Sequence, residues 1–386
     1  MIVRAGILYD GTLGKPKRNV DVEIDGERVA GIRAAAEGVE PDLRAACVTP
    51  GLVNAHAHLV GSGEPNTMAA IALASQNQQL IAAIENAAKT LRAGITSVRD
   101  LGSSHGIAQA VRDAIEERRI PGPRIRAAGR ALCMTGGHGW FIGRQTDGPW
   151  DARKAVREEL FAGADCIKVI ATGGVLTKGA VPGNAQLMPE ELEAAIDEAH
   201  RHGLRVAAHA IGTQGIKNAL RAGIDSIEHG HMLDDEAIEL FKTRNVALVP
   251  TLSAPTCILE HLHEGEQPDF VIKKAETVNE AMLKNIRRAF EAGVRIAGGS
   301  DAGTPYNRHE DYAYEIELMH RLLGMTPNQA LNAATAVAAE LLGVHRGTID
   351  AGEPADLALW KRDITDDIRA LREPVAVIKS GTTVAR

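Results

Sequence analysis

The sequence predicts an α/β fold, a (β/α)8 TIM barrel with a small β-sandwich domain formed by the N- and C-terminal segments. Two observations predict it: helix and strand patterns alternate through the middle of the chain, and both ends contain only short strand-like segments. A chain of 386 residues exceeds the usual length of one domain, which favours a large domain plus a smaller one. We expect residues 1–50 plus 347–386 to form the small β domain and residues 51–346 to form the barrel.

The two ends of the chain carry the patterns expected of strands. Residues 20–24 alternate apolar and acidic side chains, and Asp25-Gly26 follows as a hairpin turn. Similar apolar segments occur at 355–360 and 375–378. Neither end has enough strands for a stable fold by itself, so the small domain is expected to draw strands from both.

Between the ends, glycines mark a repeated change from helix to strand. Gly94, Gly163, Gly223 and Gly293 each follow a helical pattern and precede an apolar segment. Glycine is favoured just after a helix because it adopts the left-handed conformation without a Cβ clash. The apolar segments predict eight strands, at 53–59, 95–101, 124–132, 166–172, 205–211, 225–229, 247–252 and 295–300. The clearest intervening helices are 190–202, 213–222, 234–244 and 271–292.

Eight strands with crossover helices are typical of a (β/α)8 barrel. A doubly wound open sheet is the competing architecture. No Gly-x-Gly-x-x-Gly turn follows the first strand to support it, so we favour the barrel.

The composition is typical of a globular enzyme, with 45% hydrophobic and 24% charged residues. The formal charge of −7 favours neither nucleic-acid nor membrane binding, and no apolar segment is long enough to span a bilayer. The four cysteines are far apart, which fits core packing in a reduced cytosol better than a disulfide framework or a zinc finger. We expect a cytoplasmic protein, with no signal peptide, whose partner is a small-molecule substrate.

The first predicted barrel strand carries the most informative motif. His56 and His58 lie two positions apart in an apolar segment, and residues i and i+2 of a strand point to the same face. Both imidazoles are therefore expected to project into one cavity, where they would supply half of a metal site. Two ordinary core histidines are the alternative interpretation.

Other polar residues occur where further barrel strands end. The carboxyl ends of the strands form the face of a barrel on which active sites are built. Each residue alone could be structural, but six on five strands predict a metal site. Besides His56 and His58, the set comprises Lys168, His209, His229 and Asp301.

Lys168 is unusual because it lies inside an apolar strand. A buried ammonium group is costly to desolvate and would be repelled by neighbouring cations. Burial lowers the pKa of a lysine, and a neutral amine can react with carbon dioxide to give an anionic carbamate. A lysine paired with a nearby carboxylate is the alternative.

This set of six residues resembles the amidohydrolase superfamily. The segments Thr135-Gly136-Gly137-His138, 171–175 and 347–357 are similar to its prolidase-like and Xaa-dipeptidase branch, and the similarity covers essentially the whole chain. The resemblance implies a binuclear centre of two divalent ions, Zn²⁺ being the expected metal. His56 and His58 would hold one ion with Asp301, and His209 and His229 the other. Lys168, as N6-carboxylysine, would bridge both ions.

The resemblance also implies hydrolysis of an amide-type C–N bond in a dipeptide or an N-acyl amino acid-like substrate. A hydroxide bridging the two metals would attack the carbonyl carbon. Asp301 would be the catalytic residue that takes the proton and passes it to the leaving nitrogen.

Substrate contacts are expected from the loops above the strands. The resemblance suggests that His138 contacts the substrate carbonyl or carboxylate, and His231 follows the ligand His229 by two residues. Arg144 and Arg308 are cationic candidates for a substrate carboxylate, although solvated surface arginines are common.

Two positions depart from this branch. Ile211 stands where the branch often has a carboxylate-binding tyrosine, and Trp140 makes the third-strand loop bulkier and more apolar. Both favour a larger or less polar acyl group over a simple Xaa-Pro substrate.

Three alternatives remain open. An ester, lactone or cyclic-imide hydrolase would use the same metal machinery. A deaminase usually has a His-x-x-Glu pattern after strand five, whereas Gly212 lies three residues after His209. A non-catalytic scaffold would be expected to lack one or more ligands. A possible homo-oligomer contact at residues 309–324 cannot be separated by pattern from ordinary barrel packing.

Overall fold

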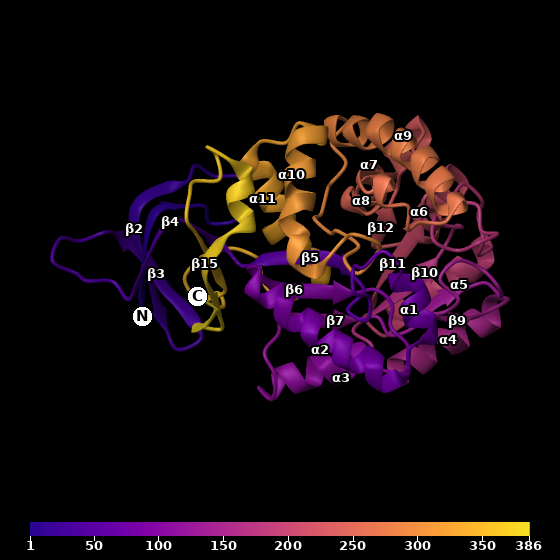
Figure 1. The fold of residues 1–386 in the computed structure, drawn as a ribbon, viewed down its shortest axis with the longest axis horizontal. Coiled ribbons are helices and arrows are strands. Elements are labelled where there is room, and N and C mark those ends of the chain that lie inside the picture. The colour runs from indigo at the N-terminus through magenta and orange to yellow at the C-terminus, as the bar shows by residue number, and fades with distance from the viewer. Residues whose placement is uncertain (386) are drawn as a thin grey trace.

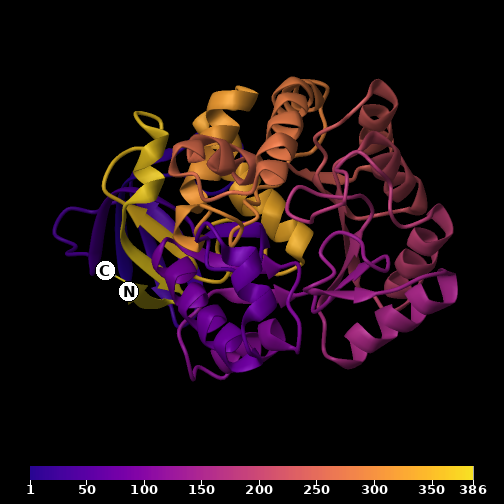
Figure 2. The ribbon, with the colours of Figure 1, turned by 45° about the vertical axis from the view of Figure 1, so that its right-hand side comes forward.

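The computed structural model describes residues 1–385, and strands from the two ends of the chain lie side by side at one end of the molecule (Figures 1 and 2). They form a seven-stranded sheet in the order β16-β15-β14-β4-β1-β2-β3. The N-terminal strands are β1 (Ile2–Leu8), β2 (Lys17–Asp25), β3 (Arg28–Ala34) and β4 (Leu43–Pro50). The C-terminal strands are β14 (Leu357–Trp360), β15 (Pro374–Lys379) and β16 (Thr382–Ala385).

This sheet differs from the predicted sandwich, because it is one continuous sheet rather than two packed sheets. β4 pairs in parallel with β1 on one side and antiparallel with β14 on the other. Val48 is therefore opposite Leu8 in β1 and Leu359 in β14, so the ladder passes unbroken from one end of the chain to the other. The three residues belong to one buried apolar cluster.

The rest of the molecule is a mixed α/β body with two parallel sheets. One contains β5 (Leu52–Ala57), β6 (Ile95–Asp100) and β7 (Arg124–Ala127). The other has the order β13-β12-β11-β10-β8-β9, formed by β8 (Ala131–Cys133), β9 (Gly143–Gln145), β10 (Cys166–Ile170), β11 (Arg205–Ala210), β12 (Ser226–His229) and β13 (Ala247–Val249). The predicted third strand, 124–132, is thus divided: β7 pairs with β6, and β8 pairs with β10.

The predicted eighth strand, 295–300, forms isolated bridges instead of a regular strand. Its backbone bonds first to Leu248 in β13, and Gly298 then accepts a bond from Ala55 in β5. A Cβ on Gly299 would lie 2.5 Å from a methyl of Val249 and 2.9 Å from the backbone nitrogen of His56. The segment passes from β13 to β5 within a few residues, at a point where the backbones approach closely. Its hydrogen-bonded ladders are therefore short, although it links the two parallel sheets.

Helices follow the strands as the sequence predicts. The predicted helices 190–202, 213–222, 234–244 and 271–292 correspond to α5 (Pro189–Arg201), α6 (Thr213–Ala222), α7 (Asp235–Arg244) and α9 (Asp269–Glu291). The four glycines that predicted helix ends all have φ between 82° and 92°. The remaining helices are α1 (Thr67–Leu73), α2 (Gln76–Arg92), α3 (Ile107–Glu116), α4 (Pro149–Phe161), α8 (Ser253–Glu260), α10 (Tyr312–Leu323), α11 (Pro327–Asn332) and α12 (Ala338–Leu342).

The segment considered for an oligomer contact, 309–324, contains α10. This helix buries Tyr312, Ile316 and Met319 in the main apolar core, as packing within one chain requires. No helix within residues 1–385 combines the length and apolar character needed to cross a membrane.

Trp360 joins the seven-stranded sheet to the α/β body. Its side chain is fully buried in the main core, and its indole nitrogen donates to the Thr49 hydroxyl at 2.9 Å. A Cβ on Gly94, just before β6, would lie 2.9 Å from the indole ring, so the ring packs directly on that backbone.

We predict that Trp360→Ala lowers the free energy of unfolding by about 3–5 kcal/mol, because it leaves a cavity at this junction. Trp150→Ala is the matched control, because Trp150 is 83% exposed on α4, and it should change stability by less than about 0.5 kcal/mol. Urea unfolding of both variants measures the difference. Equal effects would contradict the proposed role of Trp360.

Candidate metal centre

The structure brings the six sequence-predicted ligands together in one pocket. His56, His58, Lys168, His209, His229 and Asp301 all line it. Lys168, His209 and His229 lie on β10, β11 and β12, which pair in parallel; Ile170 of β10, for example, is opposite His209 of β11. His56 lies in β5, and His58 and Asp301 lie in loops. Parallel strands present their carboxyl ends at one edge, which explains how residues far apart in the sequence meet.

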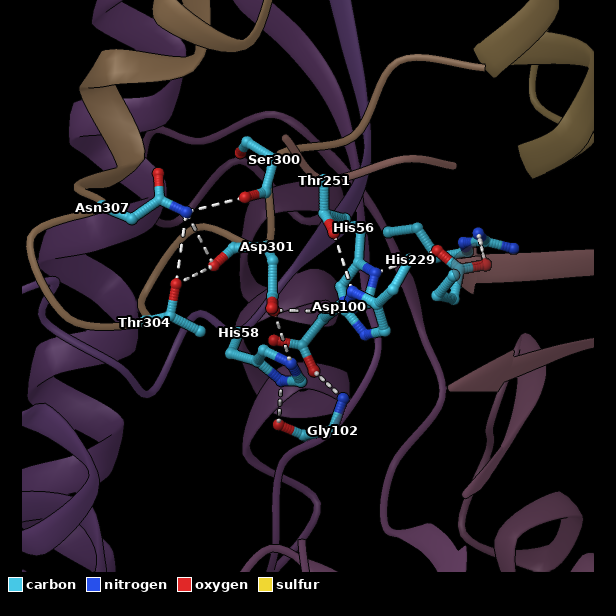
Figure 3. Close-up of polar contacts among 12 residues, drawn as sticks. His56, His58, Asp100, Gly102, His229, Thr251, Ser300, Asp301, Thr304 and Asn307 are labelled. Carbon is cyan, nitrogen blue, oxygen red and sulfur yellow. Dashed lines mark hydrogen bonds and ion pairs between the residues drawn. The ribbon is translucent and has the colours of Figure 1, made fainter. Parts of the chain in front are cut away.

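His56, His58 and Asp301 form the tightest group. The Nε2 atoms of His56 and His58 lie 3.3 and 3.2 Å from Asp301 Oδ1, and Figure 3 shows the carboxylate directed at both rings. One donor atom from each residue lies within 4.8 Å of the other two, as a shared cation requires. Burial raises the pKa of Asp301, but the two imidazoles outweigh it and lower that pKa below its ordinary value, so the group is a carboxylate.

His209 and His229 extend this cluster of imidazoles. Their ring centroids are 4.6 Å apart, and His229 lies 5.2 Å from His56. Burial, followed by the positive potential of neighbouring groups, lowers the pKa of both His209 and His229 well below 6.5. Neutral imidazole is the form that ligates metals.

Hydrogen bonds to the surrounding protein orient the rings, and for His58 and His209 they fix which nitrogen carries the proton. His58 Nδ1 donates to the Gly102 carbonyl at 3.2 Å, and His209 Nε2 donates to the Gly173 carbonyl at 3.0 Å. A carbonyl only accepts, so these nitrogens carry the protons and the other nitrogen of each ring keeps its lone pair. His229 Nδ1 is hydrogen-bonded to Thr251 Oγ1 at 2.7 Å.

His56 is oriented by a buried carboxylate that the sequence analysis did not single out. His56 Nδ1 donates to Glu228 Oε2 at 2.9 Å, and Arg99 donates to Glu228 Oε1 at 2.8 Å. Burial raises the pKa of Glu228, but Arg99 and His56 lower it to about 2. The only sequence signal for a role of Glu228 was a charged residue directly before His229. Its partner Arg99 lies 129 residues away in the sequence.

Lys168 lies on the floor of the pocket without a hydrogen-bonding partner for its Nζ. Burial lowers the pKa of this amine to about 8, although Glu228 and Asp301 raise it. A lysine tied to a carboxylate, the alternative considered from the sequence, would show a paired Nζ. The buried, unpartnered amine beside four imidazoles and a carboxylate fits a group that is completed by metal ions and carbon dioxide.

Two of the ligands, and a residue that supports one of them, have strained backbones. The φ angles of His229, Thr251 and Asp301 are 73°, 47° and 60°, in the left-handed region that non-glycine residues rarely adopt. Such strain gathers at functional sites, where surrounding contacts hold it.

The loop that carries Thr251 is held by Glu315 of α10. Both carboxylate oxygens of this fully buried residue accept backbone N–H groups, from Leu252 at 2.8 Å and from Ser253 at 2.7 Å. Burial raises the pKa of Glu315 to about 7, although the two N–H groups lower it. Glu315 thus holds the start of α8 and, through Thr251, the orientation of His229.

The predicted substrate contacts divide into two groups. His138 and His231 line the pocket; the His138 ring lies 4.5 Å from His209, and His231 Nε2 donates to the Pro250 carbonyl while its Nδ1 has no partner. Arg144 and Arg308 are not brought to the pocket. Arg144 is paired with Asp151 and Glu158, and the half-exposed Arg308 is paired with Glu64.

The walls above the ligands are apolar, which the sequence only partly indicated. Ile211 lines the pocket, whereas Trp140 lies outside it and is 50% exposed. The other apolar residues that line the pocket include Val60, Met68, Ile71, Phe141, Ile142, Val175, Leu176, Pro255, Ile258 and Val278.

The amidohydrolase family model matches residues 47–384, which include every ligand candidate. The chain belongs to the amidohydrolase family. The resemblance seen in the sequence is therefore confirmed.

Relatives with named activities resemble this chain over nearly its whole length. It is 32% identical to an ochratoxinase of Aspergillus niger, over 97% of this chain and 84% of the relative. A Xaa-Pro dipeptidase crystal structure has a TM-score of 0.90 and 33% identity, over 99% of this chain and 98% of the other. A putative prolidase from Bifidobacterium longum has a TM-score of 0.87 and 34% identity, over 100% and 94%.

The family and these relatives support metal-dependent hydrolysis of an amide C–N bond. The chain is accordingly a hydrolase that acts on a small-molecule substrate.

We predict that Glu228→Gln weakens divalent-metal binding by about 10–100-fold. The carboxylate fixes the tautomer of His56 and raises its basicity, and a neutral amide does neither as well. Glu193→Gln, at an exposed position of α5, is the matched control and should leave metal affinity unchanged. Competition with a fluorescent zinc chelator measures both. Equal affinities for the two variants would contradict the role of Glu228.

We predict a pH-dependent effect of Glu315→Gln on stability. The pKa of Glu315 is raised in the folded protein. Its contribution to the free energy of unfolding is therefore greatest below its ordinary pKa and is lost as the pH rises through about 7. The difference in unfolding free energy between wild type and variant should therefore shrink from pH 5 to pH 8. A constant difference in denaturant unfolding across this range would show that the carboxyl does not titrate as argued.

Proposed function

We propose that this protein is a binuclear-metal hydrolase, with zinc as the expected metal, that cleaves an amide-type C–N bond in a dipeptide or an N-acyl amino acid-like substrate. The observation that carries the proposal is the donor set: four imidazoles, each with one nitrogen hydrogen-bonded to the protein, the Asp301 carboxylate and the unpartnered Lys168 amine, all lining one pocket.

The residues divide between two ions. His56 and His58, with Asp301, would hold one ion, and His209 and His229 would hold the other. Lys168, carboxylated at Nζ, would bridge them, because a carbamate supplies two anionic oxygens where the free amine supplies none. When bound, the two ions would lower the pKa of a shared water and polarise the substrate carbonyl.

Asp301 is proposed as the catalytic residue. Its pKa is lowered by His56 and His58, so it is ionised and able to take a proton from the attacking water. Its carboxylate is held at the floor of the pocket, from which it would deliver that proton to the leaving nitrogen. The short backbone bond from Asp301 N to the His56 carbonyl, 2.8 Å, fixes it relative to the first strand.

His138 and His231 are proposed as substrate contacts. His231 Nε2 is held by the Pro250 carbonyl and its buried Nδ1 is unpartnered, so it can accept an N–H from a bound amide. His138 Nδ1 is hydrogen-bonded to Thr177 Oγ1 at 2.8 Å, which leaves its Nε2 for the substrate carbonyl. An ester or lactone hydrolase would use the same groups, and a substrate panel separates the two.

We also propose that the two parallel sheets and residues 295–302 together form the (β/α)8 barrel, residues 51–346. Residues 1–50 plus 347–386 would form the small domain. The backbone bonds from 295–302 to β13 and to β5 support closure. All four cysteines are buried and unpaired, which supports a reducing, cytoplasmic location.

We predict that Asp301→Asn lowers kcat at least about 100-fold while the fold is retained, because the amide cannot carry the proton. Turnover of an N-acyl amino acid and dipeptide panel by zinc-loaded protein measures the loss, with circular dichroism as the check on folding. Asp366→Asn, an exposed residue far along the chain, is the control and should be fully active. Undiminished turnover by Asp301→Asn would contradict the assigned role.

A further inference from the structure

The pocket has few charged groups. Lys168 and Asp301 line it together with the imidazoles, and no other lysine, arginine or carboxylate within residues 1–385 does so. Both charged groups are committed to the metal centre in the function proposed above. A substrate therefore meets no free ionic partner beyond the reacting bond.

The rest of the pocket lining is mainly hydrocarbon. Val60, Met68 and Ile71 come from the loop after β5 and from α1, whereas Ile258 and Val278 come from α8 and α9. Phe141, from the segment before β9, adds an aromatic ring. Because these residues come from several separate elements, we expect apolar surface to be available both to the acyl group and to the leaving group.

Three cations on the elements around this site have hydrogen-bonding partners within the protein. Lys274 donates to the carbonyls of Thr177 at 2.7 Å and Gly174 at 3.3 Å, and does not line the pocket. Arg144 and Arg308 hold carboxylates of the protein itself, as described above. None of these three lines the pocket, where it could receive a substrate carboxylate.

We propose that, given the hydrolytic function above, the preferred substrates are amides whose acyl and leaving groups are both apolar and uncharged. A free carboxylate next to the scissile nitrogen would be a handicap. It would have to leave water for a mainly hydrocarbon lining that offers no lysine or arginine partner outside the metal centre, and burying an unpaired charge is strongly unfavourable. Capped N-acyl amino acids and N-acyl alkylamines or arylamines fit this class.

The test is a matched substrate pair: N-benzoyl-leucine and N-benzoyl-3-methylbutylamine, which differ only in the leucine carboxylate. With zinc-loaded wild-type enzyme, kcat/KM for the uncharged amide should exceed that for the acid by about tenfold or more. Equal values, or a preference for the acid, would overturn this inference while supporting amide hydrolysis. If neither compound nor any of the N-acyl amino acids and dipeptides in the panel is hydrolysed, the proposed function itself fails.

A charge introduced into the wall tests the cause. Met68 is only partly buried, so Met68→Lys places an ammonium group at the pocket without burying it fully. This variant should raise kcat/KM for N-benzoyl-leucine relative to the uncharged amide by about tenfold. Leu73→Lys adds the same charge to α1 at a side chain that is 87% exposed and outside the pocket, and should leave the ratio unchanged. An unchanged ratio in Met68→Lys would contradict the explanation.

Discussion

The site depends on one constraint: in each ligand imidazole, one nitrogen is held by the protein so that the other is free. A backbone carbonyl holds His58 and another holds His209, a buried carboxylate holds His56, and a threonine hydroxyl holds His229. A histidine without such a partner could flip or exchange tautomers, and its lone pair would not stay directed at a cation. Burial then keeps the pKa values of His56, His209 and His229 low, so these rings are neutral and ready to ligate.

The fold supplies these partners from segments far apart in the sequence. Glu228 on β12 is held between His56 on β5 and Arg99 on β6. The segment after residue 295 crosses from β13 to β5 and delivers Asp301 beside the two histidines. The strained φ angles at His229 and Asp301 occur where strands give way to loops, and the hydrogen bonds around them hold that geometry.

The candidate ligands that the structure brings together could be singled out because they have local signatures. His56-x-His58 on an apolar strand and the buried Lys168 are visible without tertiary information, and strand-end positions identify His209, His229 and Asp301. The supporting partners could not be predicted, because Arg99, Thr251 and Glu315 act through contacts over long sequence distances. Arg144 and Arg308 were substrate-contact candidates that the structure does not bring to the pocket. A charged loop residue looks the same in the sequence whether it is free or paired with a carboxylate of the protein.

The same distinction applies to the fold. Helix ends were predictable from glycines, which report a local backbone conformation, and all four have the expected φ. The continuous seven-stranded sheet and the short ladders of residues 295–300 could not be predicted. Both depend on which strands pair in the folded chain, and a single segment does not encode its partner. The parallel pairing of β1 with β4, for example, leaves no pattern in either segment.

The central claim is that the buried lysine and four imidazoles form one centre for two ions. The most direct measurement is the metal content of purified protein after dialysis, compared with that of Lys168→Ala and His209→Ala. We expect about two divalent ions per wild-type chain and fewer in both variants. A wild-type protein that retains no tightly bound metal, or variants that retain the full complement, would contradict the account.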